Sequence, residues 1–226
     1  MNNFSLHQVL PSKEQIQQLP IFQNIPLQQI QVIHSLQQCH AIEQELKTCT
    51  LFGFDSESKP TFNKGEVSTG THLIQLASRD KAYLFQISPA ILEFLKPIFE
   101  NKNQIKVGFG LKNDAHLFRK KGIELHNVIE LSKCFSAFGF SNPMGLKNAM
   151  ALLFQVNFPK SKKISTSNWA RKILTPHQIE YAAADAYAPV LVFEELLRLG
   201  LLPKTITRHL FKLSMQPNTI KAETDA

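Results

Sequence analysis

Short apolar runs of strand length recur along the first two thirds of the chain and predict a β-sheet. Each run ends at polar, glycine or proline residues, as strands in globular proteins do. A Ser-Arg-Asp turn at 78–80 separates two of these runs. Strands are expected at 50–55, 72–77, 81–87, 105–109 and 125–131.

The segment before the first of these strands has two interpretations. In one, residues 30–34 form a short strand, and Ser35 with Gln38 makes the Ser-x-x-Gln pattern of a capping box that opens a helix running to about Lys47. In the other, a single long helix begins at Leu27.

Helices are indicated by apolar spacing and by residues that start or stop them. The stretch 89–101 has helical apolar spacing, and Pro97 is expected to kink it. Asn113 and Asp114 stand where a helix would begin, and Gly122 stands where it would stop.

Helices replace strands toward the C-terminus. The Asn-Pro pair at 142–143 predicts one helix start. Thr175 predicts another, since it is followed by proline in the first turn and by Gln178. Gly200 is a natural stop, and Pro189 is expected to kink or end the helix earlier. This order of elements predicts an α/β or α+β fold with a mixed β-sheet.

One domain with an arm and a tail is expected. Residues 1–28 are rich in glutamine and predict an N-terminal arm that is irregular or made of short helices wrapped on the core, residues 29–213 form the domain, and the polar residues 214–226 predict a flexible C-terminal tail. The sequence shows no internal repeat and no linker that would separate a second domain.

The composition is typical of a globular protein. The chain has 226 residues, of which 43% are apolar and 19% charged, enough to bury a sizeable core. No apolar run approaches the roughly 18 residues that a membrane span needs, and the first residues lack the layout of a secretory signal. We therefore expect a soluble, cytoplasmic protein.

Cysteines and charge narrow the function classes. Cys39, Cys49 and Cys134 make an odd number with no Cys-x-x-Cys pair, so neither a disulfide framework nor a cysteine zinc site is indicated. The net charge of +7 and the pI near 9.3 favour a polyanionic partner. Nucleic acid is favoured over a membrane, because no basic amphipathic helix is evident in the sequence.

Four acidic residues lie at the edges of apolar elements, where packing gives no reason for a charge. Asp55 and Glu57 end the first core strand, and their spacing puts both carboxylates on one face of it. Asp114 follows a later strand. Tyr181 and Asp185 stand at i and i+4 on one helical face, separated by alanines. Each feature alone has an ordinary explanation, such as a solvated strand end, a helix cap or a surface pair.

Together these acids point to a metal site. Carboxylates that share a cleft repel one another, and keeping them ionised is costly unless a cation lies among them. Ligands that are all oxygen favour Mg²⁺ or Mn²⁺. A dinucleotide-binding loop at Gly108 and Gly110 is a poor alternative, because the third glycine of that motif is missing.

Three segments resemble a known family. They are FDSE at 54–57, VGFGLKND at 107–114 and YAAAD at 181–185. They resemble the exonuclease motifs of the DEDD superfamily, in its tyrosine-containing branch (DEDDy), and are most similar to Werner-type and ribonuclease D-like 3′-5′ exonuclease domains. The likeness covers residues 30–199, with the motifs in the family's order.

The resemblance implies a ribonuclease H-like fold, with a mixed β-sheet flanked by α-helices. It also implies catalysis by two divalent metal ions, Mg²⁺ or Mn²⁺. Asp55 would bridge both ions, Glu57 and Asp185 would complete the site that holds the attacking water, and Asp114 would support the second ion. Tyr181 would orient the water. The implied activity is removal of nucleoside monophosphates from the 3′ end of DNA or RNA, on single-stranded or frayed ends.

Substrate contacts are expected beside the acids. Lys160, Lys162 and Lys163 belong to a basic loop that could hold phosphates, with Lys162 and Lys163 as the chosen contacts, and Trp169 could contact a base. Phe54 and Phe109 could wedge against terminal bases. For the aromatic residues the alternative is packing in the core, because the chain has 17 phenylalanines and a single tryptophan.

Two other functions compete with the exonuclease. A nucleic-acid-binding module could keep this fold without turnover, although such a module would not need the acids and Tyr181. A nucleotide-cofactor oxidoreductase would depend on the glycine pair and would require NAD binding.

Overall fold

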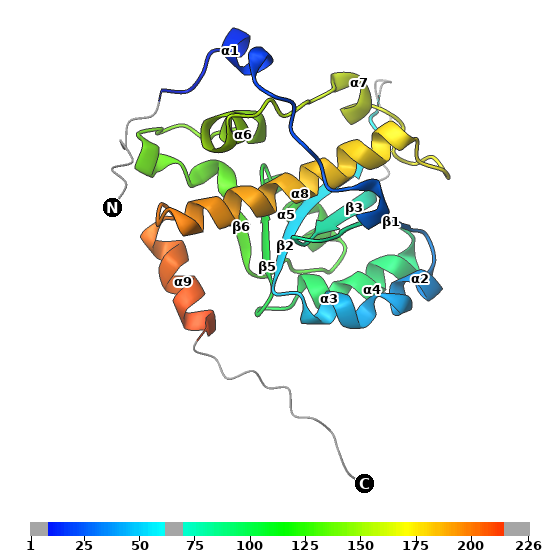
Figure 1. Cartoon of the computed structure of the whole chain (residues 1–226). Coiled ribbons are helices and arrows are strands. Elements are labelled where there is room, and N and C mark those ends of the chain that lie inside the picture. Colours follow the sequence, from blue (N-terminus) through cyan, green and yellow to red (C-terminus); the bar gives the residue numbers. More distant parts are fainter. Residues whose placement is uncertain (1–8, 62–69, 215–226) are drawn as a thin grey trace.

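The computed structural model describes residues 9–61 and 70–214 and shows a mixed six-stranded sheet in the order β1-β4-β3-β2-β5-β6 (Figure 1). Strands β2, β3 and β4 pair antiparallel, whereas β1 with β4, β2 with β5, and β5 with β6 pair parallel. The strands are β1 Ile30–Ile33, β2 Leu51–Ser58, β3 Thr71–Ala77, β4 Ala82–Gln86, β5 Ile105–Gly108 and β6 Val128–Glu130. All expected strands are present, and the last is shorter than predicted.

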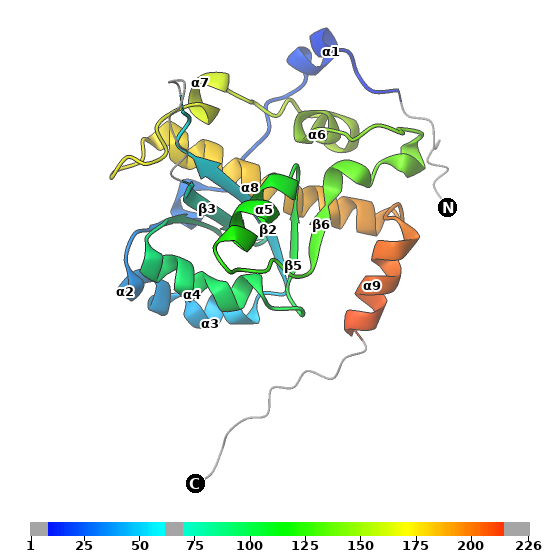
Figure 2. The same cartoon turned by 180° about the vertical axis from the view of Figure 1, so that it is seen from behind.

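Helices cover both faces of this sheet (Figures 1 and 2). The α-helices are α1 Lys13–Gln18, α2 Leu36–Ala41, α3 Glu43–Thr48, α4 Pro89–Phe99, α5 Lys112–Lys120, α6 Leu146–Phe154, α7 Lys162–Ser165, α8 Pro176–Arg198 and α9 Lys204–Ser214. Short 3₁₀ turns are η1 Leu27–Gln29, η2 Leu131–Lys133 and η3 Ser136–Phe138. The elements α2 to α5 cover one face of the sheet, and α8 crosses the other.

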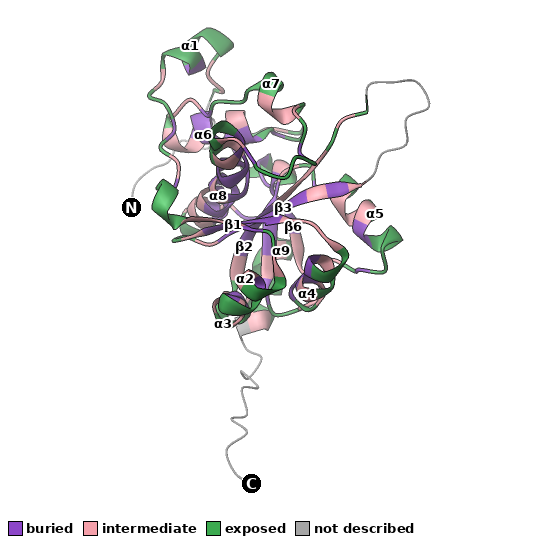
Figure 3. Cartoon of the chain, turned by 90° about the vertical axis from the view of Figure 1, so that its right-hand side faces the viewer, coloured by how far each residue is buried: buried purple, intermediate pink, exposed green. Residues whose placement is uncertain are grey.

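The alternation of side chains along β2 assigns each of its residues to one of these faces. Phe52 and Phe54 are fully buried in a cluster that includes α4 and Phe118 of α5. The residues between and after them, Gly53 and Asp55, therefore point to the α8 face. Figure 3 shows the resulting buried layer on both sides of the strands.

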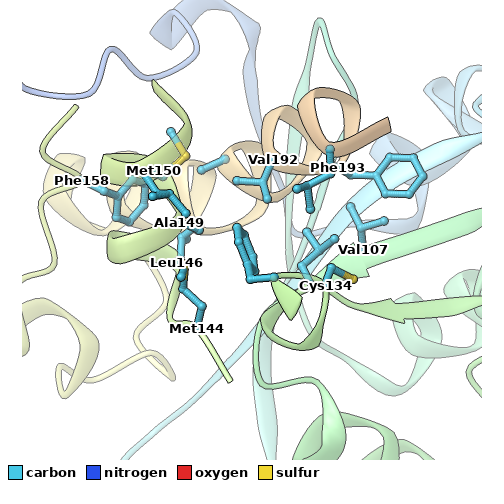
Figure 4. Packing of buried hydrophobic residues seen from close by; sticks show 14 of the residues in the cluster. Val107, Cys134, Met144, Leu146, Ala149, Met150, Phe158, Val192 and Phe193 are labelled. Carbon is cyan, nitrogen blue, oxygen red and sulfur yellow. The ribbon is translucent and has the colours of Figure 1, made fainter. Parts of the chain in front are cut away.

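Two apolar clusters lie on the α8 face. Near β5 and β6, one cluster extends from Val107 of β5 and Phe193 of α8 to Ala149 of α6, and Phe158 and Val192 belong to it (Figure 4). Near β3 and β4, alanines of α8 pack with Leu73, Leu84 and the buried Trp169. Helix α8 thus spans the whole width of the sheet.

Helix α8 begins as the sequence predicts. The Thr175 hydroxyl accepts a hydrogen bond from the Gln178 amide N–H, and the Gln178 side chain completes a capping box. The helix continues through Pro189 to Arg198, so of the two expectations for Pro189, a kink or an end of the helix, the end is wrong. Pro189 is itself buried, and α8 residues on both sides of it, including Ala186 and Phe193, pack into the core, which compensates for the one lost hydrogen bond.

Three other expectations need correction. Residues 30–33 form β1, so the long helix from Leu27 is excluded. The single helix expected to reach Lys47 is broken at Ile42 into α2 and α3. The helix predicted at 142–143 begins at Leu146 instead. Before it, the backbone N–H of Met144 bonds the carbonyl of Ser132 at 2.8 Å, which holds this stretch as a loop.

The segment before the sheet forms a short helix, α1, and then packs on the core, as one of the two interpretations of its sequence predicts. Residues 20–22 bridge to Asn157, and Phe22 packs on Phe158 with ring centroids 5.3 Å apart. Helix α9 follows Gly200, where the sequence predicts no further helix. Residues 215–226, most of the predicted flexible tail, lie outside the described residues. Within residues 9–61 and 70–214, no helix has the length and apolar character of a membrane span.

Candidate active site

The end of β2 carries the first two candidate acids. Beyond Gly53 the parallel pairing with β5 stops, while the antiparallel pairing with β3 continues to Ser58. Asp55 and Glu57 lie in this last part of β2, both half-buried and both on the α8 face. The sequence prediction that the two carboxylates share one face is confirmed.

Helix α8 brings Tyr181 and Asp185 to the same place because small residues let it lie close to β2. Ala182, Ala183 and Ala186 are fully buried against the sheet. A Cβ atom on Gly53 would lie 1.8 Å from the backbone oxygen of Ala186, so only glycine permits this approach. Asp185 is 5% exposed, and its charge acts directly on Asp55.

The turn after β5 places Asp114. Gly110 has a φ of +79°, a left-handed conformation that favours glycine. A Cβ on Gly108 would lie 2.4 Å from the Phe54 carbonyl oxygen. The positive φ of Gly110 and the close contact at Gly108 explain why both positions are glycine. The Glu130 carboxylate accepts hydrogen bonds from the N–H groups of Gly110 (3.0 Å) and Leu111 (2.8 Å), and so fixes the turn that leads to Asp114.

Asp114 lies at the rim of this acidic cluster. Its carboxylate accepts a hydrogen bond from the Ser56 hydroxyl. Burial raises the pKa of Asp114, and the bond from Ser56 opposes that rise. The charge of Asp114 still acts on both Asp55 and Glu57. The structure therefore brings all four predicted acids, from three separate elements, into one charged neighbourhood.

Burial and mutual repulsion disfavour ionisation of these acids. Burial raises the pKa of Asp55 well above its ordinary value, and the charges of Asp185, Glu57 and Asp114 raise it further. The pKa of Glu57 rises to about 8, through burial first and then the charge of Asp185. A cluster in this state gains stability from any cation that enters it.

Lys160 faces the acids. Lys160 lines the same cavity as Asp55 and Asp185, and its charge lowers the pKa values of both Glu57 and Asp185. The sequence places Lys160 in one basic loop with Lys162 and Lys163, which are exposed on α7, and it holds no signal that separates the three lysines. Glu130 was not predicted as a site residue. It ends a strand that is parallel to β5 and so reaches the same edge of the sheet.

Tyr181 is held by Asp185. Burial raises the pKa of the Tyr181 hydroxyl, and the nearby charges of Asp185 and Glu57 raise it further, together with a hydrogen bond to Asp185. The same bond lowers the pKa of Asp185, against the effect of burial. Tyr181 is therefore a neutral hydrogen-bond donor at neutral pH.

A cavity of about 390 Å³ opens beside the acids. Asp55, Asp185 and Lys160 supply its charged groups, and Phe109 and Met144 form part of its apolar wall. Phe109 thus lies in the wall of the cavity that Asp55 and Asp185 also line. Its predicted contact with a base stays a prediction.

Two predicted substrate contacts are not available in this structure. Phe54 is fully buried between the rings of Phe99 and Phe118. Trp169 is 1% exposed, its indole N–H donates to the Ser165 carbonyl, and its ring packs beside Tyr181. Neither ring can stack on a base, so both predictions are corrected. Trp169 instead supports the Tyr181 side of the site.

The carboxylate oxygens of the four acids fit divalent cations, although their side chains do not surround a single point. Among the residues that the structure describes, no three His, Cys, Asp or Glu side chains are arranged to hold a metal ion. The oxygen Oδ1 of Asp185 is buried and has no hydrogen-bond partner within the described part of the chain. A buried acceptor of this kind, among repelling carboxylates, suits a hard cation such as Mg²⁺ or Mn²⁺.

Comparison with known proteins agrees with this geometry. A family model described as 3′-5′ exonuclease matches residues 30–200. The bifunctional 3′-5′ exonuclease/ATP-dependent helicase WRN of Mus musculus is 31% identical over 169 residues, which are 70% of this chain and 12% of that protein. The exonuclease mut-7 homolog of Aedes aegypti is 27% identical over 219 residues, 84% of this chain and 28% of that protein. The chain thus spans a minor part of these relatives.

Solved structures show the same fold. The Nibbler EXO domain of Aedes aegypti superposes with a TM-score of 0.70 at 22% identity, covering 84% of this chain and all of that one (100%). Ribonuclease D of Escherichia coli superposes with a TM-score of 0.62 at 20% identity, covering 82% of this chain and 50% of that one. The fold is ribonuclease H-like, as the sequence predicts. By its matching family model and its fold, the chain belongs to the 3′-5′ exonuclease family of the DEDD superfamily.

Proposed function

We propose that this chain is an active, metal-dependent 3′-5′ exonuclease of the tyrosine branch. It would hydrolyse the terminal phosphodiester at a 3′ end and release a nucleoside monophosphate. The observation that supports this most is the grouping of Asp55, Glu57, Asp114 and Asp185, whose pKa values are all raised, at one edge of the sheet. A module that only binds nucleic acid gains nothing from such a costly arrangement.

The acids would hold two divalent ions, Mg²⁺ or Mn²⁺. Asp55 would be shared between them, and the charges of the other three acids, which all act on it, support this role. Glu57 and Asp185 would complete one site, and Asp114 would support the other. When bound, such ions stabilise charge on the attacking and leaving oxygens and make a water molecule acidic enough to attack at neutral pH.

Tyr181 would orient the attacking water or the scissile phosphate. Its raised pKa keeps the phenol protonated, so it donates a hydrogen bond and is a poor general base. Asp185 and the packed ring of Trp169 hold the phenol in place. The role therefore depends on the position of the hydroxyl group.

The substrate would be a 3′-terminal strand of DNA or RNA. Lys160 provides a cation for a phosphate at the wall of the cavity, and Phe109 provides an aromatic surface for a base. The net charge of +7 favours the approach of a polyanion. The expected cytoplasmic location remains a prediction.

Digestion of a 5′-labelled single-stranded oligonucleotide with Mn²⁺ tests this function. The wild-type chain should give a ladder of shortened labelled products, and EDTA should abolish it. D55N should reduce the rate at least about a thousandfold, because it removes the shared ligand. D80N is the matched control, since Asp80 lies exposed in the turn between β3 and β4, and it should cut normally.

Other outcomes have clear meanings. Binding of the oligonucleotide without shortening would contradict catalysis and support the non-catalytic binding module. A ladder that D55N leaves unchanged would show that the acids do not carry the activity. Shortening from the labelled 5′ end would contradict the proposed polarity.

A further inference from the structure

Gln75 is a polar side chain buried where packing alone would favour an apolar one. It lies in β3, is 0% exposed, and neither its Nε2 nor its Oε1 has a hydrogen-bond partner in the described residues. Leu73 and Ala77, its neighbours on the same face of β3, both pack under α8. A buried amide without partners destabilises a fold. The chain therefore keeps Gln75 despite a cost to stability.

The register of the sheet places Gln75 next to the acids. In the antiparallel ladder of β2 and β3, Gln75 is the direct partner of Asp55. Directly opposed residues point to the same face, with their Cβ atoms about 5 Å apart. A glutamine side chain spans that separation. The other neighbour of Gln75 in the ladder is Leu84 of β4, which has no polar side chain.

The chemistry of an amide suits the support of a metal-binding carboxylate. The Asp55 oxygen Oδ1 accepts the backbone N–H of Ser56 at 2.8 Å. An amide N–H from Gln75 would supply the same carboxylate with a second donor. A lysine there would neutralise the acid, whereas glutamine donates a hydrogen bond without competing with a cation. Partners that orient a ligand in this way strengthen metal binding by about 10- to 100-fold.

We propose that Gln75 is a positioning residue for Asp55, donating a hydrogen bond to its carboxylate, directly or through one water molecule, and so fixing it for metal binding. This inference rests on the proposed function, because it gives Asp55 the role of a metal ligand. Gln75 itself touches neither metal nor substrate.

Q75M tests the inference, because methionine fills a similar volume without polar atoms. Q104M is the matched control. Gln104 is also buried, at 3% exposed, but its amide nitrogen donates to the carbonyls of Leu46 (2.7 Å) and Cys49 (2.8 Å), away from the acids. Thermal unfolding in EDTA, Mn²⁺ binding by titration calorimetry and single-turnover cleavage would be measured for both variants.

The variants Q75M and Q104M should differ in stability, Mn²⁺ affinity and cleavage rate. Q75M should unfold at the same temperature as the wild type or higher, yet bind Mn²⁺ about tenfold more weakly and cleave about tenfold more slowly. Added Mn²⁺ should restore part of the lost rate. Q104M should unfold at a lower temperature and keep both its Mn²⁺ affinity and its cleavage rate at wild-type levels.

These measurements distinguish a failure of the inference about Gln75 from a failure of the exonuclease proposal. Wild-type Mn²⁺ affinity in Q75M would overturn the inference, whatever its melting temperature, and would leave the exonuclease proposal untouched. A wild-type chain that binds Mn²⁺ but does not cleave would overturn the exonuclease proposal alone. The Mn²⁺ affinity of Q75M would still decide the role of Gln75.

Discussion

The two faces of β2 serve opposite purposes within a single strand. On the α4 side, Phe52 and Phe54 are fully buried among other aromatic rings. On the α8 side, the alternate residues are Gly53, Asp55 and Glu57, which leave room for a helix backbone and then present charge. The period of two that defines a strand thus separates stability from chemistry. Substitutions on the first face should change folding, and those on the second should change function.

The largest expected effect on stability lies on the aromatic face. F54A removes a ring packed against Phe99 and Phe118, so it should lower the free energy of unfolding by about 4 kcal/mol. Urea unfolding of the metal-free protein measures this. A loss below about 1 kcal/mol would show that the cluster repacks around the gap.

The second largest effect on stability is expected for G53A. This substitution lies on the α8 face, yet it should impair folding as well as activity. The added Cβ meets the backbone of Ala186, which cannot move aside as a flexible side chain could. We expect a loss of about 3 kcal/mol in the free energy of unfolding, together with a large loss of activity, because α8 also carries Asp185. G145A is the control, since nothing lies within 4 Å of a Cβ there. Normal activity in G53A would contradict the close approach of α8.

Lys106 is the exception on the aromatic face. It is fully buried beside Phe52 in the ladder, and its Nζ donates to the Asn101 carbonyl at 2.8 Å and the Phe99 carbonyl at 3.3 Å. Burial lowers the pKa of Lys106 to about 8. Between that value and the ordinary lysine pKa of about 10.4, the unfolded chain binds more protons than the folded one. Stability should therefore rise with pH across this window.

Comparison with K106M isolates this contribution. The free energy of unfolding of the wild type, relative to that of K106M, should increase by up to about 3 kcal/mol between pH 7 and pH 10.5. Denaturant unfolding at several pH values measures the difference. Parallel pH profiles for the two proteins would contradict a lowered pKa.

On the α8 side, Lys160 and Lys163 can be compared to test which lysine interacts with the substrate. It lines the cavity of the acids, whereas Lys163 is exposed on α7. K160Q should reduce kcat/KM for oligonucleotide cleavage about tenfold, equivalent to about 1.4 kcal/mol, and K163Q should reduce it far less. Steady-state kinetics at fixed ionic strength test this. Equal losses in the two variants would indicate general attraction of the polyanion.

The smallest expected effect has the opposite sign. The pKa of Asp185 is raised by burial, so its ionised form destabilises the metal-free fold at neutral pH. D185N should therefore increase the free energy of unfolding by about 1 kcal/mol in EDTA, while abolishing cleavage. A clear loss of stability in D185N would show that its bond with Tyr181 outweighs the burial of the charge.

Local signals in the sequence determined most of the fold. Short apolar runs of strand length located the strands, and the capping pattern at Thr175 located the start of α8. They failed where tertiary contacts override local preference. Pro189 does not end α8 because the flanking residues are buried, and the pair at 142–143 does not open a helix because Met144 is fixed to Ser132.

The sequence by itself also predicted which side chains share a face, because the spacing of Asp55 and Glu57 follows the period of a strand and that of Tyr181 and Asp185 follows the period of a helix. Only the tertiary structure decided which lysine faces the acids, which aromatic rings are buried, and why Gln75 lies beside Asp55. Those facts depend on strand register and on how closely α8 packs against β2. Strand register and helix packing depend on contacts between residues far apart in the sequence, so no local sequence pattern predicts them.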